Sequence, residues 1–431
     1  MKLWDKGFSV DQAIEKFTVG NDRELDIKLA EYDVLGNMAH ARMLHSIGIL
    51  STDEVRDLLG ELQNILGEIE NGEFEIEAEF EDVHSKIEHL LTERVGDAGK
   101  KIHTARSRND QVLVDLHLFA KAEIMHIKDH VDSLFELLQS LSEKHKDVLL
   151  PGYTHLQVAM PSSFGLWFGA YAESLVDDMH FLKAAYQVSN QNPLGSAAGY
   201  GSSFPINRTM TTDELGFETM RFNSVAAQMS RGKLEKSVSF ALASLASTLG
   251  KLADDVCLYM SQNFDFIGFP KELTTGSSIM PHKQNPDVFE LVRATANEIQ
   301  ALPQRLTLLT TNMTSGYHRD YQLLKEPFMK GIEQCREILM ITHFMLENII
   351  VKESVVHDST YNYLFSVDAL NKRVLAGATF REAYKELGME IQSGNFEPDR
   401  AVKHTHEGSI GNLCTTEIAA KYHRVWDSID A

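Results

Sequence analysis

Apolar residues recur along the chain at spacings of three, four and seven, the periodicity of one face of an α-helix. The longest such stripe follows Asn109 and ends before Pro151 and Gly152, which stop a helix. It consists of Leu113, Leu116, Ala120, Ile127, Val131, Leu134, Leu138 and Leu141. A helix of this size is about 55 Å long. Such a length suits a helical bundle better than a small globule.

Three further segments show the same helical pattern, from Phe164 to Tyr186, from Leu234 to Val256 and from Val288 to Leu302. Asn285 and Pro286 precede the last one, where the asparagine is placed to cap the helix and the proline to take its first position. These apolar stripes exceed what the core of one chain needs. We therefore expect helices from several copies of the chain to pack together.

The patterns predict an all-α fold. Because 431 residues exceed one ordinary hydrophobic core, two or three domains are expected. We predict a mixed helical head in residues 1–105, a central long-helix bundle in residues 106–353 and a small helical tail in residues 354–431.

Composition narrows the class of protein. Apolar residues make up 43% of the chain and charged residues 24%, the balance of a soluble globular protein. The sequence shows no run long enough to span a bilayer and no signal-peptide core at its start. Cys257, Cys335 and Cys414 fit neither a disulfide framework nor a paired-cysteine metal site. These features indicate the cytoplasm.

The formal net charge of −21 argues against nucleic acid or an anionic membrane as a partner. The same field repels an anionic small molecule. A site for such a substrate must therefore concentrate positive charge and N–H donors locally.

Two polar segments interrupt the helical pattern early. Lys100–Val112 brings Thr104, Arg106, Ser107, Arg108 and Asn109 to the start of the long helix, a combination typical of anion binding. The alternative is a capped helix start with solvated arginines. Leu150–Pro161 is predicted to be a non-helical loop with Thr154 and His155 together. His155 is a candidate general acid or base, and a structural histidine is the alternative.

Two later segments have similar chemistry. In Thr274–Glu290, Gly276, Ser277 and Ser278 predict a mobile loop beside Lys283 and Asn285. This setting can stabilise an oxyanion or lower the pKa of a serine that acts as a base. A flexible polar linker is the alternative. Ser315–Phe328 offers donors from Tyr317, Gln322 and Lys325, with a solvated helix start as the alternative.

Other candidate sites are weaker. No glycine-rich phosphate loop, dinucleotide fingerprint or CxxC pair occurs in the sequence. Glu79, Glu81, Asp82 and His84 resemble a loose metal cluster, but we interpret them as a charged surface turn. His404 and His406 are interpreted as part of a solvated tail loop. We therefore predict no metal site.

The polar segments together resemble a known family. GSSIMPHKQNPD resembles the shared loop of the fumarase/aspartase superfamily, and HTARSRNDQ resembles the argininosuccinate lyase motif, usually HTGRSRNDQ. PGYTHLQ, EDVHSKIE at residues 81–88 and NPLGSAAGYG at residues 192–201 agree. The similarity extends from about Trp4 to Ile350.

The resemblance implies a fold of three helical domains whose central helices form a homotetramer, with each active site shared between subunits. It implies an anti elimination without metal or organic cofactor, which splits argininosuccinate into arginine and fumarate in arginine biosynthesis. Ser277 then matches the base, although chemistry alone does not separate it from Ser278. His155 matches the proton donor and Glu290 its carboxylate partner. Lys283 and Asn285 match the groups that stabilise the enediolate.

The resemblance also implies a substrate-holding set, which comprises Ser107, Arg108, Asn109, Thr154, Tyr317, Gln322 and Lys325. His84 matches a histidine near the site whose role stays open.

Two segments depart from the family. Ser230, Arg231, Gly232 and Lys233 replace the usual SDRDF, and Asp22 replaces a common serine. These departures leave open a sister lyase that acts on adenylosuccinate or a modified argininosuccinate. A non-catalytic, crystallin-like structural protein is the alternative from another class.

Overall fold

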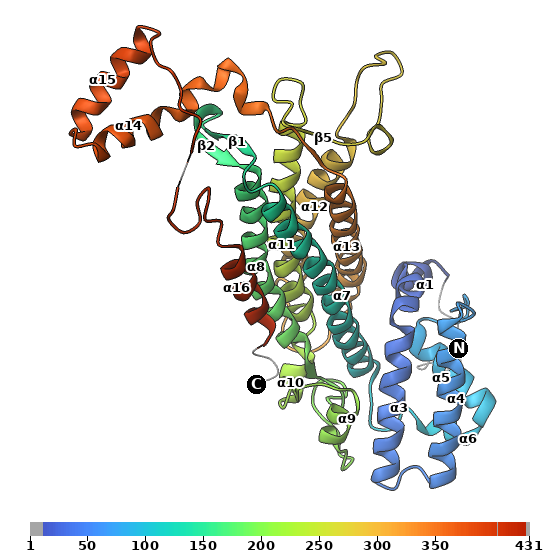
Figure 1. The fold of residues 1–431 in the computed structure, drawn as a ribbon. Helices are drawn as coiled ribbons and strands as arrows, with labels where there is room; N and C mark the ends of the chain where they lie inside the picture. The colour runs from blue at the N-terminus through green and yellow to red at the C-terminus, as the bar shows by residue number, and fades with distance from the viewer. Residues whose placement is uncertain (1–11, 403, 428–431) are drawn as a thin grey trace. The chain divides into compact units, whose positions relative to one another are not determined.

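Helices dominate the computed structural model, which describes residues 12–402 and 404–427 (Figure 1). Five helices have more than 20 residues each. They are α7 (Arg108–Lys144), α8 (Phe164–Ser189), α11 (Lys233–Tyr259), α12 (Asp287–Leu309) and α13 (Lys325–Glu347). Four of them, α7, α8, α11 and α12, contain the apolar stripes described in the sequence. The prediction of an all-α fold is confirmed.

The shorter helices lie mainly at the two ends of the chain. They are α1 (Gln12–Val19), α2 (Asp22–Asp26), α3 (Ala30–Ser46), α4 (Thr52–Glu70), α5 (Val83–Val95), α6 (Asp97–Lys101), α9 (Arg208–Glu214), α10 (Ser224–Gln228), α14 (Ser366–Leu375), α15 (Phe380–Gln392) and α16 (Thr415–Asp427). Five 3₁₀ helices join them, namely η1 (Ile27–Leu29), η2 (Lys271–Leu273), η3 (Arg319–Leu324), η4 (Val355–His357) and η5 (Ser359–Phe365).

In the part of the chain that the structure describes, short strands form three two-stranded sheets. β1 (Leu149–Thr154) pairs with β2 (Gln157–Ser163) in an antiparallel hairpin. β3 (Gln191–Asn192) runs parallel to β4 (Thr219–Met220), and β5 (Ile267–Gly268) is antiparallel to β6 (Ile350–Val351). The predicted non-helical segment before Pro161 is thus a hairpin.

The chain divides into two compact units. Unit 1 comprises Met1–His126, Leu182–Ala243 and Ala301–Glu333, and unit 2 comprises Ile127–Phe181, Ser244–Gln300 and Gln334–Ala431. Each of the five long helices therefore contributes one section to each unit. The predicted division into three domains stays a prediction.

In unit 1, helices α3, α4 and α5 enclose a core that includes Leu44, Leu58, Leu62 and Leu91. Ser51 begins α4 with a capping box, in which its side chain accepts a hydrogen bond from Glu54 N. Gly99 lets α6 approach α5 closely, because a Cβ there would lie 2.4 Å from the Leu91 carbonyl carbon. This packing fixes α5, which carries His84 in its first turn.

In unit 2, polar contacts join the helices α8 and α11 of the bundle. Asp255 accepts hydrogen bonds from Trp167 Nε1 at 2.9 Å and from the Tyr171 hydroxyl at 2.6 Å. The helix α16 docks through Tyr422, whose ring stacks on Phe135 with centroids 3.8 Å apart. Satisfied polar groups and aromatic packing stabilise this end of the bundle.

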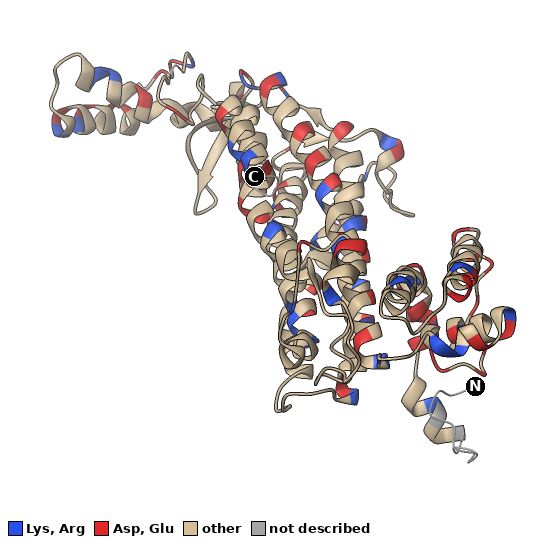
Figure 2. Cartoon of the chain, turned by 90° about the horizontal axis from the view of Figure 1, so that it is seen from below, with Lys and Arg blue, Asp and Glu red and all other residues tan. Residues whose placement is uncertain are grey.

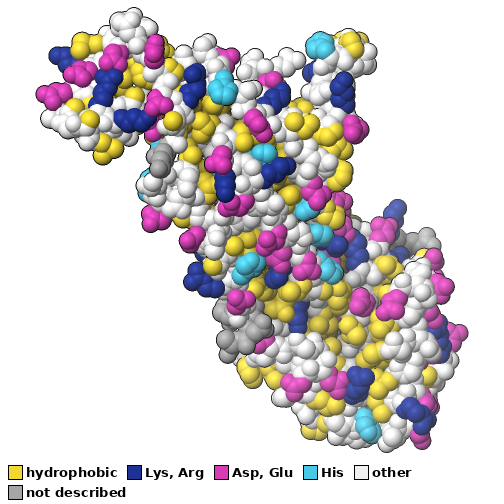
Figure 3. Space-filling view, in the orientation of Figure 1, with side chains coloured by type: hydrophobic (Ala, Val, Ile, Leu, Met, Phe, Trp, Pro, Cys, Tyr) yellow, Lys and Arg dark blue, Asp and Glu magenta, His cyan; other side chains and the backbone are white. Residues whose placement is uncertain are grey.

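Charged and apolar side chains both reach the surface. Figure 2 shows Asp and Glu interspersed with Lys and Arg along the helices, and Figure 3 shows hydrophobic side chains among them on the viewed face. Large exposed apolar residues on the long helices are Phe181, Phe240, Leu291, Leu308, Met340, Ile341 and Phe344. No helix within the described ranges is long and apolar enough to cross a membrane.

Candidate active site

Unit 1 contains a polar cavity to which widely separated segments contribute. Six predicted site residues line it, namely His84, Arg108, Asn109, Tyr317, Gln322 and Lys325. The other lining residues are Asp22, Asp26, Asp82, Val112, Arg231 and Arg319. Ser107, also predicted, is not among them.

Helix N-termini surround this cavity. His84 lies in the first turn of α5, Arg108 and Asn109 begin α7, and Lys325 begins α13. The first N–H groups of each helix lack intrahelical acceptors, and the helix dipole is positive at that end. Their convergence favours an anionic ligand.

Most cations of the cavity are held by carboxylates. Lys325 Nζ lies 2.6 Å from Asp26 Oδ1 and 2.8 Å from Asp22 Oδ1. Arg108 contacts Asp82 directly and lies 3.3 Å from Glu81 Oε2. Burial raises the pKa of Asp22, although the charge of Lys325 opposes this effect. The cations are thus oriented before any ligand arrives.

The departures at Asp22 and Arg231 belong to this cavity. Arg231 Nε donates to Glu235 Oε1 at 2.8 Å and its Nη2 donates to the Tyr321 carbonyl at 2.9 Å. Both contacts are buried and fix the end of η3, which carries Gln322. The Gln322 amide in turn donates to the carbonyls of Thr18 and Val19. These contacts tie the start of the chain to the cavity.

Backbone hydrogen bonds to the Asp110 carboxylate hold the segment before α7. Ser107 N donates to Asp110 Oδ1 at 2.8 Å, and the backbone N–H groups of Gly195 and Ala197 donate to Oδ2 at 3.0 Å. Ala105 has a φ of 65°, where an L-residue is strained. The motif that this segment resembles usually has glycine at this position. The left-handed backbone explains the preference for glycine.

In unit 2, His155 lies at the tip of the β1–β2 hairpin. Thr154 pairs with Gln157, and the two residues between them, His155 and Leu156, have φ values of 54° and 56°. Both turn residues are left-handed, as in a type I′ turn, which normally uses asparagine and glycine. Strain of this kind is frequent at functional sites. The exposed His155 imidazole makes no hydrogen bond to another described residue.

The loop with Ser277 also belongs to unit 2. An isolated bridge joins Thr275 to Asn285 at its base. The Ser277 hydroxyl oxygen accepts backbone hydrogen bonds from Met280 N at 3.2 Å and Ile279 N at 3.4 Å. Donors aimed at this oxygen favour its ionised form. A negative charge on the Ser277 oxygen would therefore be stabilised by these two donors.

Lys283, Asn285 and Glu290 line one cavity of unit 2. The expected cap at Asn285 is wrong, because α12 begins only at Asp287. The Asn285 side chain instead donates to Thr275 Oγ1 and to the Gly276 carbonyl, both at 3.4 Å. It therefore supports the base of the loop.

The predicted residues thus fall into two sets. Unit 1 holds His84, Ser107, Arg108, Asn109, Tyr317, Gln322 and Lys325, and unit 2 holds Thr154, His155, Ser277, Lys283, Asn285 and Glu290. The interpretation of Glu81, Asp82 and His84 as a surface turn is wrong, since all three are buried. Asp82 caps α5 by accepting from Ser85 N at 2.8 Å, so its burial has a structural reason.

Sequence reasoning missed several residues. Asp26 and Arg319 line the cavity of unit 1, but no helical or motif pattern marks either one. Asp33 and Asp115 lie beside His84 and form with it the one group of potential metal ligands found in the described ranges. Asp115 could have been noticed in the sequence, because it is a charged residue between Leu113 and Leu116 of the apolar stripe on the predicted long helix.

Comparison with known proteins gives consistent matches. A family model described as "Lyase" matches residues 7–301. The argininosuccinate lyase of Parabacteroides distasonis is 58% identical over 98% of this chain and 95% of its own length. That of Thermotoga neapolitana is 39% identical over 89% of this chain and 96% of its own.

Solved structures share the fold at low sequence identity. An EDDS lyase in complex with formate has a TM-score of 0.78 and 19% identity, covering 98% of this chain and 92% of that one. A "fumarate lyase:delta crystallin" from Brucella melitensis bound to cobalt has a TM-score of 0.72 and 16% identity, covering 97% and 93%.

Proposed function

The chain belongs to the argininosuccinate lyase family, and we propose that it splits argininosuccinate into arginine and fumarate as a step of arginine biosynthesis. The observation that carries this proposal is the 58% identity with a relative of that name over 98% of the chain. The polar cavity of unit 1 and the donor-rich loop of unit 2 support it, because a substrate with several carboxylates requires local cations and N–H groups.

The reaction is an anti elimination. Ser277, as an alkoxide, removes a proton from the carbon beside a carboxylate of the succinyl group. The electrons move into that carboxylate and form an enediolate, to which Lys283 and Asn285 present positive charge and N–H donors. The C–N bond then breaks, the double bond of fumarate forms, and His155 gives a proton to the departing nitrogen. Glu290 orients the imidazole and stabilises its charged form.

The groups that hold the substrate come mostly from unit 1. Arg108, Asn109 and Lys325 lie at helix N-termini, where carboxylates are favoured. Tyr317, Gln322, Ser107 and Thr154 add donors, and His84 adds a further one from α5. No step requires a metal or an organic cofactor.

We propose that the protein acts as a homotetramer in the cytoplasm, with active sites shared between subunits. Exposed apolar residues on α12 and α13, such as Leu291, Leu308 and Phe344, supply surfaces that association would bury. All three cysteines are free thiols, as expected in a reducing compartment.

Fumarate release tests the function directly. Purified protein is mixed with argininosuccinate or adenylosuccinate, and fumarate is followed by its ultraviolet absorbance. Turnover of argininosuccinate alone is expected. Turnover of adenylosuccinate alone would favour the sister lyase, and no turnover of either would favour a structural role.

Mixing of two inactive variants tests the shared site. Ser277→Ala and His155→Ala proteins are combined under conditions that exchange subunits, and partial recovery of activity is expected. Absence of recovery, after exchange is shown by native mass spectrometry, would mean that one subunit supplies both residues.

A further inference from the structure

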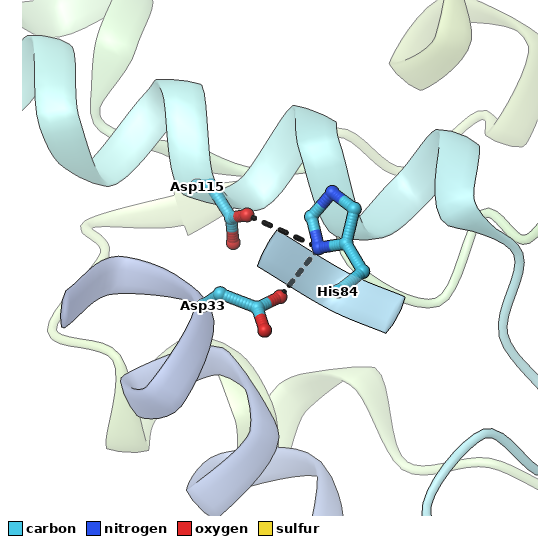
Figure 4. A group of neighbouring side chains, drawn as sticks. All are labelled: Asp33, His84 and Asp115. Atoms are coloured by element: carbon cyan, nitrogen blue, oxygen red, sulfur yellow. Dashed lines mark hydrogen bonds and ion pairs between the residues drawn. The ribbon is translucent and has the colours of Figure 1, made fainter. Parts of the chain in front are cut away.

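Three buried side chains from three helices of unit 1 meet in one cluster (Figure 4), and one of them, His84, lines the polar cavity. They are Asp33 on α3, His84 on α5 and Asp115 on α7, and their ligand atoms lie within 4.8 Å of one another. His84 Nδ1 lies 2.7 Å from Asp33 Oδ1 and 3.7 Å from Asp115 Oδ2. Their side chains are at most 2% exposed, so solvent does not stabilise their charges.

The two carboxyl groups differ in their hydrogen bonds. Asp33 accepts from His84 Nδ1 through Oδ1 and from Asn37 Nδ2 at 2.9 Å through Oδ2. Asp115 has no hydrogen-bond donor for either oxygen among the described residues. Hydrogen bonds to a carboxylate favour its ionised form, whereas burial without them favours the neutral acid. The geometry therefore points to an ionised Asp33 and a protonated Asp115.

This assignment makes the cluster electrically neutral. An ionised Asp115 would be a buried carboxylate without a hydrogen-bond donor among the described residues, which is costly even near the positive charge of Arg106. One proton on Asp115 removes this negative charge. Burial and the charge of Asp33 raise the pKa of Asp115 well above its usual value. Burial lowers the pKa of His84, but the charge of Asp33 and the hydrogen bond between Asp33 and His84 outweigh this effect and raise the pKa to about 9.

Other titratable groups surround the cluster. The buried Arg106 donates to Asn37 Oδ1 at 2.6 Å and to the Ile102 carbonyl at 2.9 Å. His103 lies near His84, and burial lowers the pKa of His103 to about 4, so it stays neutral near pH 7. Burial raises the pKa of Glu88. Asp26, which acts on His84 through its charge, is held by Lys325.

His84 retains one free donor position. Figure 4 shows the second ring nitrogen facing away from both carboxyl groups. This atom, Nε2, is buried without a hydrogen-bond partner among the described residues. His84 is also a lining residue of the cavity. An N–H at this position is therefore available to donate to a ligand in the cavity.

We propose that Asp33 is a positioning residue, which presents His84 as a charged donor to a carboxylate of the substrate, while the neutral Asp115 packs beside the ring. Asp33, ionised, holds Nδ1 and fixes the ring. Asp115, neutral, fills the remaining side without cancelling the positive charge. This inference rests on the proposed function, because the substrate must supply the carboxylate.

A metal ion is the competing explanation of the cluster. It would displace the proton from His84 Nδ1 and require both aspartates to be ionised. The 2.7 Å contact between Nδ1 and Asp33 has the length of a charge-assisted hydrogen bond, which favours the proton. The two explanations make opposite predictions for Asp115.

Asp33→Asn and Asp115→Asn form a matched pair, because each replaces a carboxyl group by an amide of nearly the same size. Asp33→Asn is expected to raise the KM for argininosuccinate about tenfold or more, the usual effect of losing a hydrogen bond to a charged group. Asp115→Asn is expected to leave KM within about twofold, since it replaces one neutral group by another. Thermal unfolding and native mass spectrometry verify the fold and assembly of each variant.

The pH profile of kcat/KM distinguishes positioning from a merely structural role. In the wild type, it should fall as pH rises through about 9, where His84 loses its proton. Asp33→Asn should move this fall to lower pH, and Asp115→Asn should not. If Asp33→Asn fails to fold, His84→Gln provides the second test. Its KM should rise as in Asp33→Asn, and its kcat/KM should show no fall near pH 9 that depends on residue 84.

Equal losses in Asp33→Asn and Asp115→Asn would overturn the proposal, and so would a stoichiometric metal ion in the purified protein. An unchanged pH profile in Asp33→Asn would do the same. Wild-type turnover of argininosuccinate in the same assay separates this inference from the proposed function, since a wild type without activity would refute that function first.

Discussion

Lys325 Nζ lies 2.6 Å from Asp26 Oδ1, and both side chains are buried. Removing the charge of Asp26 leaves a buried ammonium with Asp22 as its remaining ion-pair partner. We expect Asp26→Asn to lower the free energy of unfolding by about 3 kcal/mol, measured by urea denaturation at neutral pH. Asp22→Asn is the matched control and should cost less, because Asp22 is more exposed. Equal stability of Asp26→Asn and the wild type would contradict this account of the cavity.

Ala105 gives a stability prediction of the opposite sign. Its φ of 65° is strained for alanine and free for glycine. Ala105→Gly should raise the free energy of unfolding by about 1 kcal/mol. This gain requires that relief of strain exceed the entropy that glycine adds to the unfolded chain. A lower melting temperature would show that the strain at Ala105 is smaller than this entropy cost.

Ser277 gives the main catalytic prediction. Ser277→Ala should lower kcat about a thousandfold, within the range for loss of a general base, while the assembly stays intact. Ser278→Ala is the control and should retain most of the activity. Fumarate absorbance measures both variants. Normal turnover in Ser277→Ala combined with loss in Ser278→Ala would move the role to the second serine.

His117 predicts a pH dependence of stability. Burial lowers its pKa to about 3, and its ring nitrogens lie 2.8 Å from the Ser189 carbonyl and 3.2 Å from Ser230 Oγ. The unfolded chain takes up this proton below about pH 6.5, whereas the folded chain does not. Stability is therefore lost as pH falls from about 6.5 towards 3, by at most about 1.4 kcal/mol per pH unit.

His117→Gln removes this contribution. Its free energy of unfolding, although lower at neutral pH, should fall less steeply with acid than that of the wild type. Denaturation curves at several pH values between neutrality and pH 4 measure the two slopes. Parallel slopes would mean that His117 is protonated in the folded chain.

The sequence predicts the long helices well because their periodicity is local. The stripe from Leu113 to Leu141 lies within α7, and Asn109 lies in its first turn. The β1–β2 hairpin could not be predicted, since its turn uses His155 and Leu156 in place of the usual asparagine and glycine. Neither histidine nor leucine predicts a left-handed turn conformation.

The site was predictable only where residues cluster along the chain. Arg108 and Asn109 are adjacent in one polar segment, and Lys283 and Asn285 lie two positions apart in another. Asp33 and Asp115 are distant in sequence and meet His84 only through the packing of α3, α5 and α7. Likewise, Asp26 reaches Lys325 across 299 positions. Such pairs depend on tertiary structure, which local patterns do not specify.

Product analysis of the wild type beside Ser277→Ala tests the central claim most directly. Each protein is incubated with argininosuccinate, and arginine and fumarate are quantified together by proton NMR. The account predicts equal amounts of arginine and fumarate with the wild type and only traces of either with Ser277→Ala. Unchanged argininosuccinate with the wild type, or equal product formation by both proteins, would contradict it.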